Sequence, residues 1–129
     1  MTKEHYVVVV ADDNVTINNF LYDLLHDEGY HVLCCFSGED AQRVIRRVIP
    51  DVAILDMQME ERAAGLHVLE WLRQHPETAR VSVIICSADV PFLEAKKKDI
   101  TAYGGEIVYK PFDVPHLLAT IEKLLMATP

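Results

Sequence analysis

Five short apolar runs alternate with five longer amphipathic segments along this chain of 129 residues. The runs are typical of strands, and they span residues 6–10, 32–36, 52–55, 81–86 and 107–109. The first four show little polar alternation, which indicates strands covered on both faces of a parallel sheet. Parallel neighbours cannot be joined by a tight turn, so each connection has to cross over the sheet.

The segments between the runs have the 3.6-residue period of amphipathic helices. In the first segment one apolar face is formed by Ile17, Phe20, Leu21, Leu24 and Leu25. The second has the same spacing over residues 41–49, begins with an acidic capping sequence at 37–40 and ends before Pro50.

Proline residues indicate where the third helix ends and where the fourth and fifth helices begin. The third helix carries apolar residues between 68 and 72 and ends before Pro76. The fourth and fifth begin at Asp-Val-Pro sequences at 89–91 and 113–115, where proline in the first turn is favourable.

This alternation predicts an α/β fold of the (βα)5 type, a doubly wound five-stranded parallel sheet with right-handed crossovers. Five strands in so short a chain favour the flavodoxin-like strand order 2-1-3-4-5. At roughly 100–200 residues per domain, residues 1–129 form a single domain, with a core from about residue 6 to residue 126.

Composition and charge exclude several functional classes. The chain has 12 Lys and Arg against 20 Asp and Glu, a net charge of −8 that disfavours direct nucleic-acid binding. The longest aliphatic run, residues 7–11, is far shorter than the about 20 residues of a membrane helix. The charged N-terminal residues precede a run too short for a signal peptide, so we expect a cytoplasmic protein.

Three cysteines and six histidines offer no metal-binding pattern. Cys34, Cys35 and Cys86 lie in predicted strands without a Cys-x-x-Cys pair, and we expect buried free thiols in a reducing compartment. The histidines are scattered, with no pair at i and i+4.

Polar residues follow four of the five predicted strands. They are Asp12 and Asp13, Asp56, Ser87 and Lys110. In open parallel sheets the carboxyl ends of the strands share one edge, where ligands bind. Helix capping is an alternative for each residue singly. Capping explains Asp56 poorly, because the next clear helix begins near residue 65.

Three carboxylates at one edge have to bind a cation or a proton, because two of them 4 Å apart repel by about 4 kcal/mol at an effective dielectric constant near 20. Oxygen ligands suit Mg²⁺, and a carboxylate nucleophile with Mg²⁺, a lysine and a hydroxyl is suited to phosphoryl transfer. The sequence contains no glycine-rich phosphate loop, so the phosphoryl donor is not expected to be a bound nucleotide.

Four short motifs, in this order and spacing, resemble the receiver domains of two-component response regulators. They are Ala11-Asp12-Asp13, Ile54-Leu55-Asp56-Met57, Cys86-Ser87-Ala88 and Lys110-Pro111-Phe112. The resemblance covers residues 6 to 126 and implies the same fold class, which is also called CheY-like.

The resemblance implies that Asp56 is the phosphoacceptor and attacks the phosphohistidine of a partner kinase. It also implies that Asp12, Asp13, Asp56 and the backbone carbonyl of Gln58 bind Mg²⁺.

It further implies that Ser87 is a hydroxyl that moves toward the phosphoryl group and that Lys110 pairs with phosphoryl oxygens. Gln58 and Asp89 match positions that tune the lifetime of the acyl phosphate.

The partners implied are a histidine kinase or phosphotransfer protein and an output domain or effector protein, with no nucleic acid and no membrane. The family also forms phosphorylation-dependent dimers. The implied activity is self-phosphorylation and self-dephosphorylation without turnover of a separate substrate, and the signal is a shift between two conformations.

Two positions depart from the family. Ile107 occupies the place of a switch aromatic, and Tyr109 is either a substitute on the same strand face or a plain packing residue. Glu60 occupies the place of a proline, and we expect Glu60 and Glu61 to be solvated, with added negative charge beside the metal as the alternative. For Lys96–Lys98 we expect a solvated helix flank, with partner docking as an alternative.

Two other functions remain open. A pseudo-receiver, a phosphate-independent interaction module, is favoured by Ile107 and disfavoured by the intact acidic residues. A Mg²⁺-dependent phosphohydrolase typically has an acid/base carboxylate two residues after the nucleophile, where this chain has Gln58.

Overall fold

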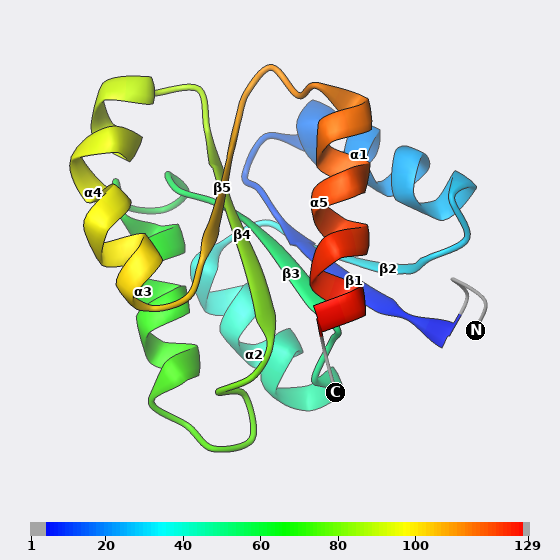
Figure 1. The fold of residues 1–129 in the computed structure, drawn as a ribbon, viewed down its shortest axis with the longest axis horizontal. Coiled ribbons are helices and arrows are strands. Elements are labelled where there is room, and N and C mark those ends of the chain that lie inside the picture. Colours follow the sequence, from blue (N-terminus) through cyan, green and yellow to red (C-terminus); the bar gives the residue numbers. More distant parts are fainter. Residues whose placement is uncertain (1–4, 128–129) are drawn as a thin grey trace.

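A computed structural model describes residues 5–127 as one sheet with helices on both faces (Figure 1). The strands are β1 Val7–Ala11, β2 His31–Cys35, β3 Val52–Asp56, β4 Ser82–Ser87 and β5 Glu106–Tyr109. The helices are α1 Val15–Asp27, α2 Gly38–Val48, α3 Ala64–Arg73, α4 Val90–Ala102 and α5 Val114–Ala127.

All neighbouring strands are parallel, and their order is β2-β1-β3-β4-β5. The predicted fold class is therefore confirmed. The outermost parts of the predicted domain, residues 1–4 and 128–129, lie outside the described residues. Within residues 5–127, none of the helices has the length and apolarity needed to cross a membrane.

The two faces of the sheet bury separate cores. Val9 and Ala11 of β1 face α2, α3 and α4, whereas Val8 and Val10 face α1 and α5. Consecutive residues of β1 are thus buried on opposite sides, and all five residues of β3 are buried as well. This double cover explains why the central strands are continuous apolar runs.

The predicted starts of the second, fourth and fifth helices are confirmed by capping contacts. The side chains of Ser37, Asp89 and Asp113 accept hydrogen bonds from amides in the first turns of α2, α4 and α5. Asn14, for which no start was predicted, caps α1 in the same way. The apolar patterns are less complete than predicted. Phe20 is 43% exposed and stacks on Phe112. Ile49 ends α2 in a left-handed conformation (φ 46°) and is exposed.

A close contact joins the end of β3 to the start of α3. A Cβ atom at Gly65 would lie 2.5 Å from the carbonyl oxygen of Asp56, too close for any side chain. The amide of Gly65 also donates to the carbonyl of Met57 at 2.9 Å. Glycine at this position therefore lets the first turn of α3 rest directly on the strand that carries Asp56.

The expectation for the cysteines is correct for two of them and wrong for the third. All three are free, and Cys35 and Cys86 are buried, but Cys34 is exposed. Both cysteines of β2 lie on an edge strand, but their side chains point to opposite faces: Cys35 packs in the core with α2 and α3, and Cys34 belongs to neither core.

Thiol labelling should separate these cysteines. A maleimide added to the folded protein is expected to modify Cys34 alone, slowly, because burial raises the pKa of its thiol above the ordinary value and the thiolate is the reactive form. Intact mass measures the number of labels. The Cys34→Ser variant should take none until it is unfolded, and labelling of that variant in the folded state would contradict the prediction.

Candidate functional site

The residues that follow the strands line one cavity of about 530 Å³ at the carboxyl edge of the sheet. The cavity contains every predicted site residue, namely Asp12, Asp13, Asp56, Gln58, Ser87, Asp89 and Lys110. They meet because β1 lies between β2 and β3 and β4 lies between β3 and β5, so the strand ends form one continuous edge.

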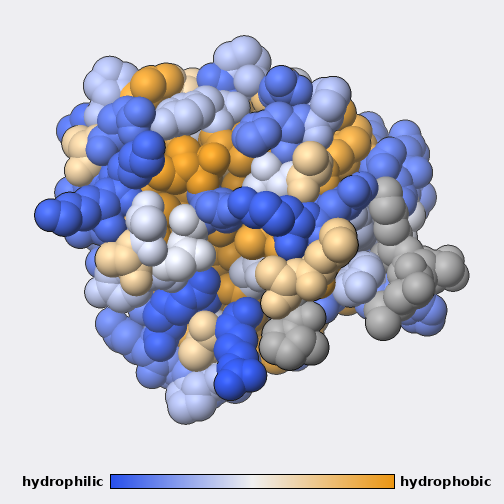
Figure 2. Space-filling view, in the orientation of Figure 1, coloured by the Kyte–Doolittle hydropathy of each residue, from blue (hydrophilic) through white to orange (hydrophobic). Residues whose placement is uncertain are grey.

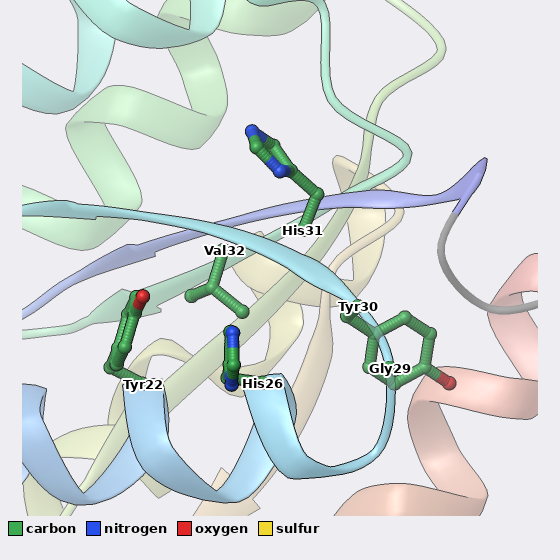
Figure 3. A pocket seen from close by; sticks show the side chains of 6 residues that line it. All are labelled: Tyr22, His26, Gly29, Tyr30, His31 and Val32. Carbon is green, nitrogen blue, oxygen red and sulfur yellow. The ribbon is translucent and has the colours of Figure 1, made fainter.

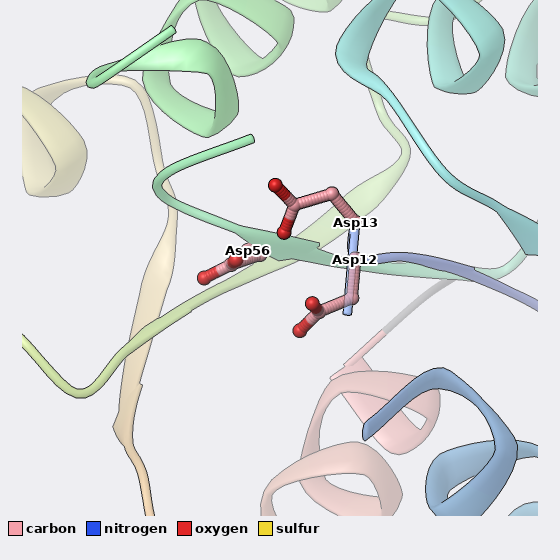
Figure 4. A group of neighbouring side chains, drawn as sticks. All are labelled: Asp12, Asp13 and Asp56. Carbon is pink, nitrogen blue, oxygen red and sulfur yellow. The ribbon is translucent and has the colours of Figure 1, made fainter. Parts of the chain in front are cut away.

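Three carboxylates gather at the centre of this cavity. The side chains of Asp12 and Asp13 leave the end of β1 beside Asp56 at the end of β3 (Figure 4). One carboxylate oxygen from each lies within 4.8 Å of the others. Asp12 and Asp56 are buried, whereas Asp13 is exposed.

This carboxylate group suits a metal ion. Among residues 5–127, it is the one group of at least three His, Cys, Asp or Glu side chains close enough to share an ion. Its oxygen donors fit a hard divalent cation, as predicted from the sequence.

Lys110 supplies positive charge to the two buried carboxylates. Its Nζ lies 2.6 Å from Oδ2 of Asp12 and 3.3 Å from Oδ1 of Asp56. Burial alone would lower the pKa of Lys110, but its hydrogen bonds to Asp12 and Asp56 and their negative charges outweigh burial and raise the pKa. The lysine is therefore charged at neutral pH.

The surroundings of Asp56 shift the pKa of its carboxyl group. Burial and the neighbouring charge of Asp12 raise its pKa to about 6, against the opposing effect of Lys110. The carboxylate is consequently the main form at pH 7, and it is poorly solvated. An anionic oxygen with little hydration is suited to nucleophilic attack.

Hydrogen bonds fix the orientation of Asp12. Its Oδ1 accepts from the amide of Asn14 at 2.9 Å, while its Oδ2 accepts from Lys110. The sequence analysis missed Asn18, whose Nδ2 donates to the carbonyls of Asp12 at 2.9 Å and Cys35 at 2.7 Å. The available signal in the sequence was a polar residue at a position that shares the apolar face of the first helix, three residues before Leu21 and seven before Leu25.

Ser87 and Asp89 form the opposite side of the cavity. The buried Ser87 Oγ accepts from the amide of Asp89 at 3.0 Å. Asp89 caps α4 by accepting from the amide of Phe92, and Gln58 Nε2 lies 3.4 Å from its Oδ2. Gln58 and Asp89 thus contact each other in the lining of the cavity.

Glu60 is exposed, as expected, but it is also hydrogen-bonded to another element. Its carboxylate accepts hydrogen bonds from the amides of Gly38 at 2.7 Å and Glu39 at 3.0 Å, at the start of α2. Partial burial would raise its pKa, but the hydrogen bonds from the backbone of Gly38, of Glu60 itself and of Glu39 lower it. Glu61 also has a partner, since it pairs with His67 on the surface.

Tyr109 lies on the same side of β5 as Ile107. Ile107 packs against the core formed with α3 and α4, while Val108 faces the other core. Tyr109 is 37% exposed and is close to Glu94 of α4, where burial, a hydrogen bond to Glu94 and its charge raise the pKa of the phenol. The two residues therefore share a face, as the alternation along the strand predicts.

The three lysines of α4 are not equivalent. Lys97 and Lys98 are exposed, whereas Lys96 is half-buried with its Nζ 5.8 Å from the ring centre of Phe92. The face that carries α4, β5 and α5 is mostly hydrophilic, with hydrophobic atoms visible between α4 and α5 (Figure 2).

A separate cavity of about 440 Å³ lies between α1 and β2 and contains none of the predicted site residues. Tyr22 and His26 project from α1 toward Val32, while His31 leaves β2 on the other side (Figure 3). Its two histidines belong to no metal-binding group among the described residues.

The chain matches known proteins in both sequence and structure. The family model of the response regulator receiver domain matches residues 8–122. The chain is 31% identical over 127 residues to the polar-differentiation response regulator DivK of Brucella ovis. The alignment covers 97% of this chain and 98% of DivK.

Two further proteins extend the comparison. The chain is 28% identical over 118 residues to the phosphate regulon transcriptional regulatory protein PhoB of Rhizobium meliloti, covering 92% of this chain and 51% of PhoB. The chain therefore spans about half the length of that relative. The receiver domain of a Francisella response regulator, 1452, matches with a TM-score of 0.83 and 26% identity over 96% of this chain and 99% of that domain.

Proposed function

This chain belongs to the response regulator receiver domain family, and on that basis we propose that it accepts a phosphoryl group on Asp56 and thereby changes its interaction surface. Receiver domains are signalling modules of two-component systems rather than enzymes that turn over a separate substrate. The proposal includes the whole of residues 1–129 as one receiver domain.

The observation that carries the proposal is the meeting of three carboxylates and one lysine in a single cavity. Helix capping would explain carboxylates at separate helix starts, but it does not place Lys110 2.6 Å from Asp12 and 3.3 Å from Asp56. A site of this kind compensates negative charge, and phosphoryl transfer is a reaction that depends on such compensation.

In the proposed reaction, an Asp56 carboxylate oxygen attacks the phosphorus atom of a phosphohistidine. The new O–P bond forms as the P–N bond breaks, and the imidazole nitrogen of the donor leaves with the electron pair. Hydrolysis then returns the carboxylate, because water attacks phosphorus, the O–P bond of Asp56 breaks and inorganic phosphate is released.

The other residues of the site assist the same step. We assign Mg²⁺ to Asp12, Asp13, Asp56 and the backbone carbonyl of Gln58, where it would supply charge neutralisation to the phosphoryl oxygens. Lys110 would pair with one of these oxygens.

The remaining polar groups would act after transfer. Ser87 would move toward the phosphoryl group and donate a hydrogen bond from its hydroxyl to a phosphoryl oxygen. Gln58 and Asp89, whose side chains contact each other in the lining of the cavity, would control how water reaches the acyl phosphate.

The proposed donor is a histidine kinase or phosphotransfer protein, and the recipient of the signal is an output domain or effector protein. A phosphorylation-dependent dimer is part of the same proposal, as is a cytoplasmic location, which suits the three free thiols. The phosphate-independent alternative is less favoured, because such a module has no need for a charge-compensated buried carboxylate.

Phosphorylation by a small donor tests the proposal. The protein is incubated with Mg²⁺ and an acyl-phosphate compound, and its intact mass is measured. We expect one phosphoryl adduct that requires Mg²⁺, disappears with a chelator and is absent in Asp56→Asn. A folded protein that binds Mg²⁺ and takes no adduct would overturn the proposal in favour of the interaction module.

A further inference from the structure

The segment from residue 57 to residue 63 joins the phosphoacceptor strand to α3 and carries an unusual contact to α2. The two carboxylate oxygens of Glu60 accept separate hydrogen bonds from the amides of Gly38 and Glu39. The first amides of a helix have no partner within the helix, and its N-terminus attracts negative charge. Glu60 is therefore held by α2 at two points, 21 and 22 residues away in sequence.

The start of α2 is shaped to receive this carboxylate. A Cβ atom at Gly38 would lie 3.2 Å from Oε1 of Glu60 and 3.2 Å from Cγ2 of Val68. Ser37 meanwhile accepts from the amide of Asp40. The amides at the start of α2 thus have two acceptors: Ser37, which is next to the helix in sequence, and Glu60, which is distant in sequence. Because Gly38 has no side chain, the Glu60 carboxylate has room to approach.

Backbone hydrogen bonds to other parts of the fold hold the two ends of the segment but not its middle, where Met59 packs against the core and Gln58 Nε2 lies 3.4 Å from Asp89 Oδ2. The amide of Met57 donates to the carbonyl of Cys86 at 2.8 Å, and Gly65 donates to Met57. Between these points the described backbone bonds are local, from Met59 and Ala64 to the carbonyl of Glu61.

Side-chain contacts therefore decide where the middle of the segment lies. Arg62 stacks on Phe92 of α4, with its guanidinium carbon 4.1 Å from the ring centre. Glu60 provides the hydrogen bonds to α2, two residues after Gln58, which lines the cavity.

We infer that Glu60 is a positioning residue for the site: by fastening the segment to the N-terminus of α2, it holds the backbone of Gln58 in place for a divalent cation. This inference rests on the proposed function for the role of the Gln58 carbonyl. Glu60 itself touches neither the cation nor the phosphoryl group, so its effect is on metal affinity rather than on the transfer step.

Three variants separate positioning from charge. Glu60→Gln removes the charge and one acceptor, whereas Glu60→Asp keeps the charge but is one methylene too short to reach α2. Glu61→Gln is the matched control, because it removes a neighbouring charge that pairs with the exposed His67.

Calorimetric titration with Mg²⁺ measures the outcome. We expect both Glu60 variants to raise the Mg²⁺ dissociation constant by about tenfold, the lower end for loss of a residue that orients a metal ligand. In the adduct assay, the half-saturating Mg²⁺ concentration should rise equally, while the rate at saturating Mg²⁺ stays within about twofold. Glu61→Gln should match the wild-type protein in both.

Hydrogen exchange without Mg²⁺ gives an independent readout, since the amides of Gly38 and Glu39 should exchange faster in both Glu60 variants. Faster exchange with unchanged Mg²⁺ affinity would overturn the inference, and so would equal effects of Glu60→Gln and Glu61→Gln with none from Glu60→Asp. A wild-type protein that binds Mg²⁺ but forms no adduct would overturn the proposed function alone, and the calorimetric comparison would still decide the role of Glu60.

Discussion

Replacing Lys110 with alanine is expected to destabilise the folded protein by about 3 kcal/mol at neutral pH, the cost of removing one partner of a buried ion pair. The side chains of Lys110, Asp12 and Asp56 are 13%, 3% and 10% exposed, so solvent screens their charges weakly. Without the lysine, two buried carboxylates would face each other with no cation. The same variant should form the phosphoryl adduct at least about 100-fold more slowly, because charge compensation of this kind is worth that much in catalysis.

Denaturant unfolding at pH 7 measures the loss of stability, and Lys123→Ala is the matched control. Lys123 also pairs with a carboxylate, Glu106 at 2.5 Å, but its side chain is 67% exposed. Exposed pairs contribute about 0–1 kcal/mol, so this control should change little. Added Mg²⁺ should return part of the stability lost in Lys110→Ala. Equal losses in the two variants would show that Lys110 is not buried with its partners in solution.

Replacing Asp56 with asparagine is expected to stabilise the metal-free protein at pH 7 while removing the adduct. The pKa of Asp56 rises to about 6 from 3.8. A shift of one pKa unit corresponds to about 1.4 kcal/mol, so the charged form costs the fold roughly 2–3 kcal/mol. Between about pH 4 and pH 6 the folded protein holds a proton that the unfolded chain has lost, and wild-type stability therefore falls as pH rises through this window.

Unfolding free energies measured from pH 4 to pH 8 test this dependence. The advantage of Asp56→Asn should be near zero at pH 4 and should grow until about pH 7. Asp113→Asn is the control, because Asp113 accepts from the amide of His116 at the start of α5 and asparagine caps a helix equally well. An Asp56→Asn variant that is less stable than wild type at pH 7 would contradict the prediction.

The fold could be predicted because its strands differ so clearly from its helices. β3 is buried on both faces, which leaves an apolar run with no helical period, and proline residues mark the helix starts at 91 and 115. The site residues could be predicted for a topological reason. The carboxyl ends of parallel strands meet at one edge, so Asp12 and Asp56 become neighbours although 44 residues separate them.

Contacts that depend on the three-dimensional path of a loop could not be predicted. Glu60 reaches α2 because the segment after β3 bends across its end, and no local pattern encodes that bend. Asn18 joins the carbonyls of Asp12 and Cys35, which meet only after β1 and β2 have paired. The exposure of Cys34 depends on how well the helices cover its face of the edge strand β2, which the apolar residues around it in the sequence do not indicate.

The direct contact of Gly65 with the carbonyl of Asp56 has a mechanical consequence. The end of β3 and the first turn of α3 are in direct backbone contact with no side chain between them. A displacement of the Asp56 backbone would therefore move α3 as well. The residues between them are held separately, by the hydrogen bonds of Glu60 to the amides of Gly38 and Glu39. A larger residue at position 65 would push the first turn of α3 away from the end of β3. It would change the orientation of the Asp56 side chain although position 65 does not line the cavity.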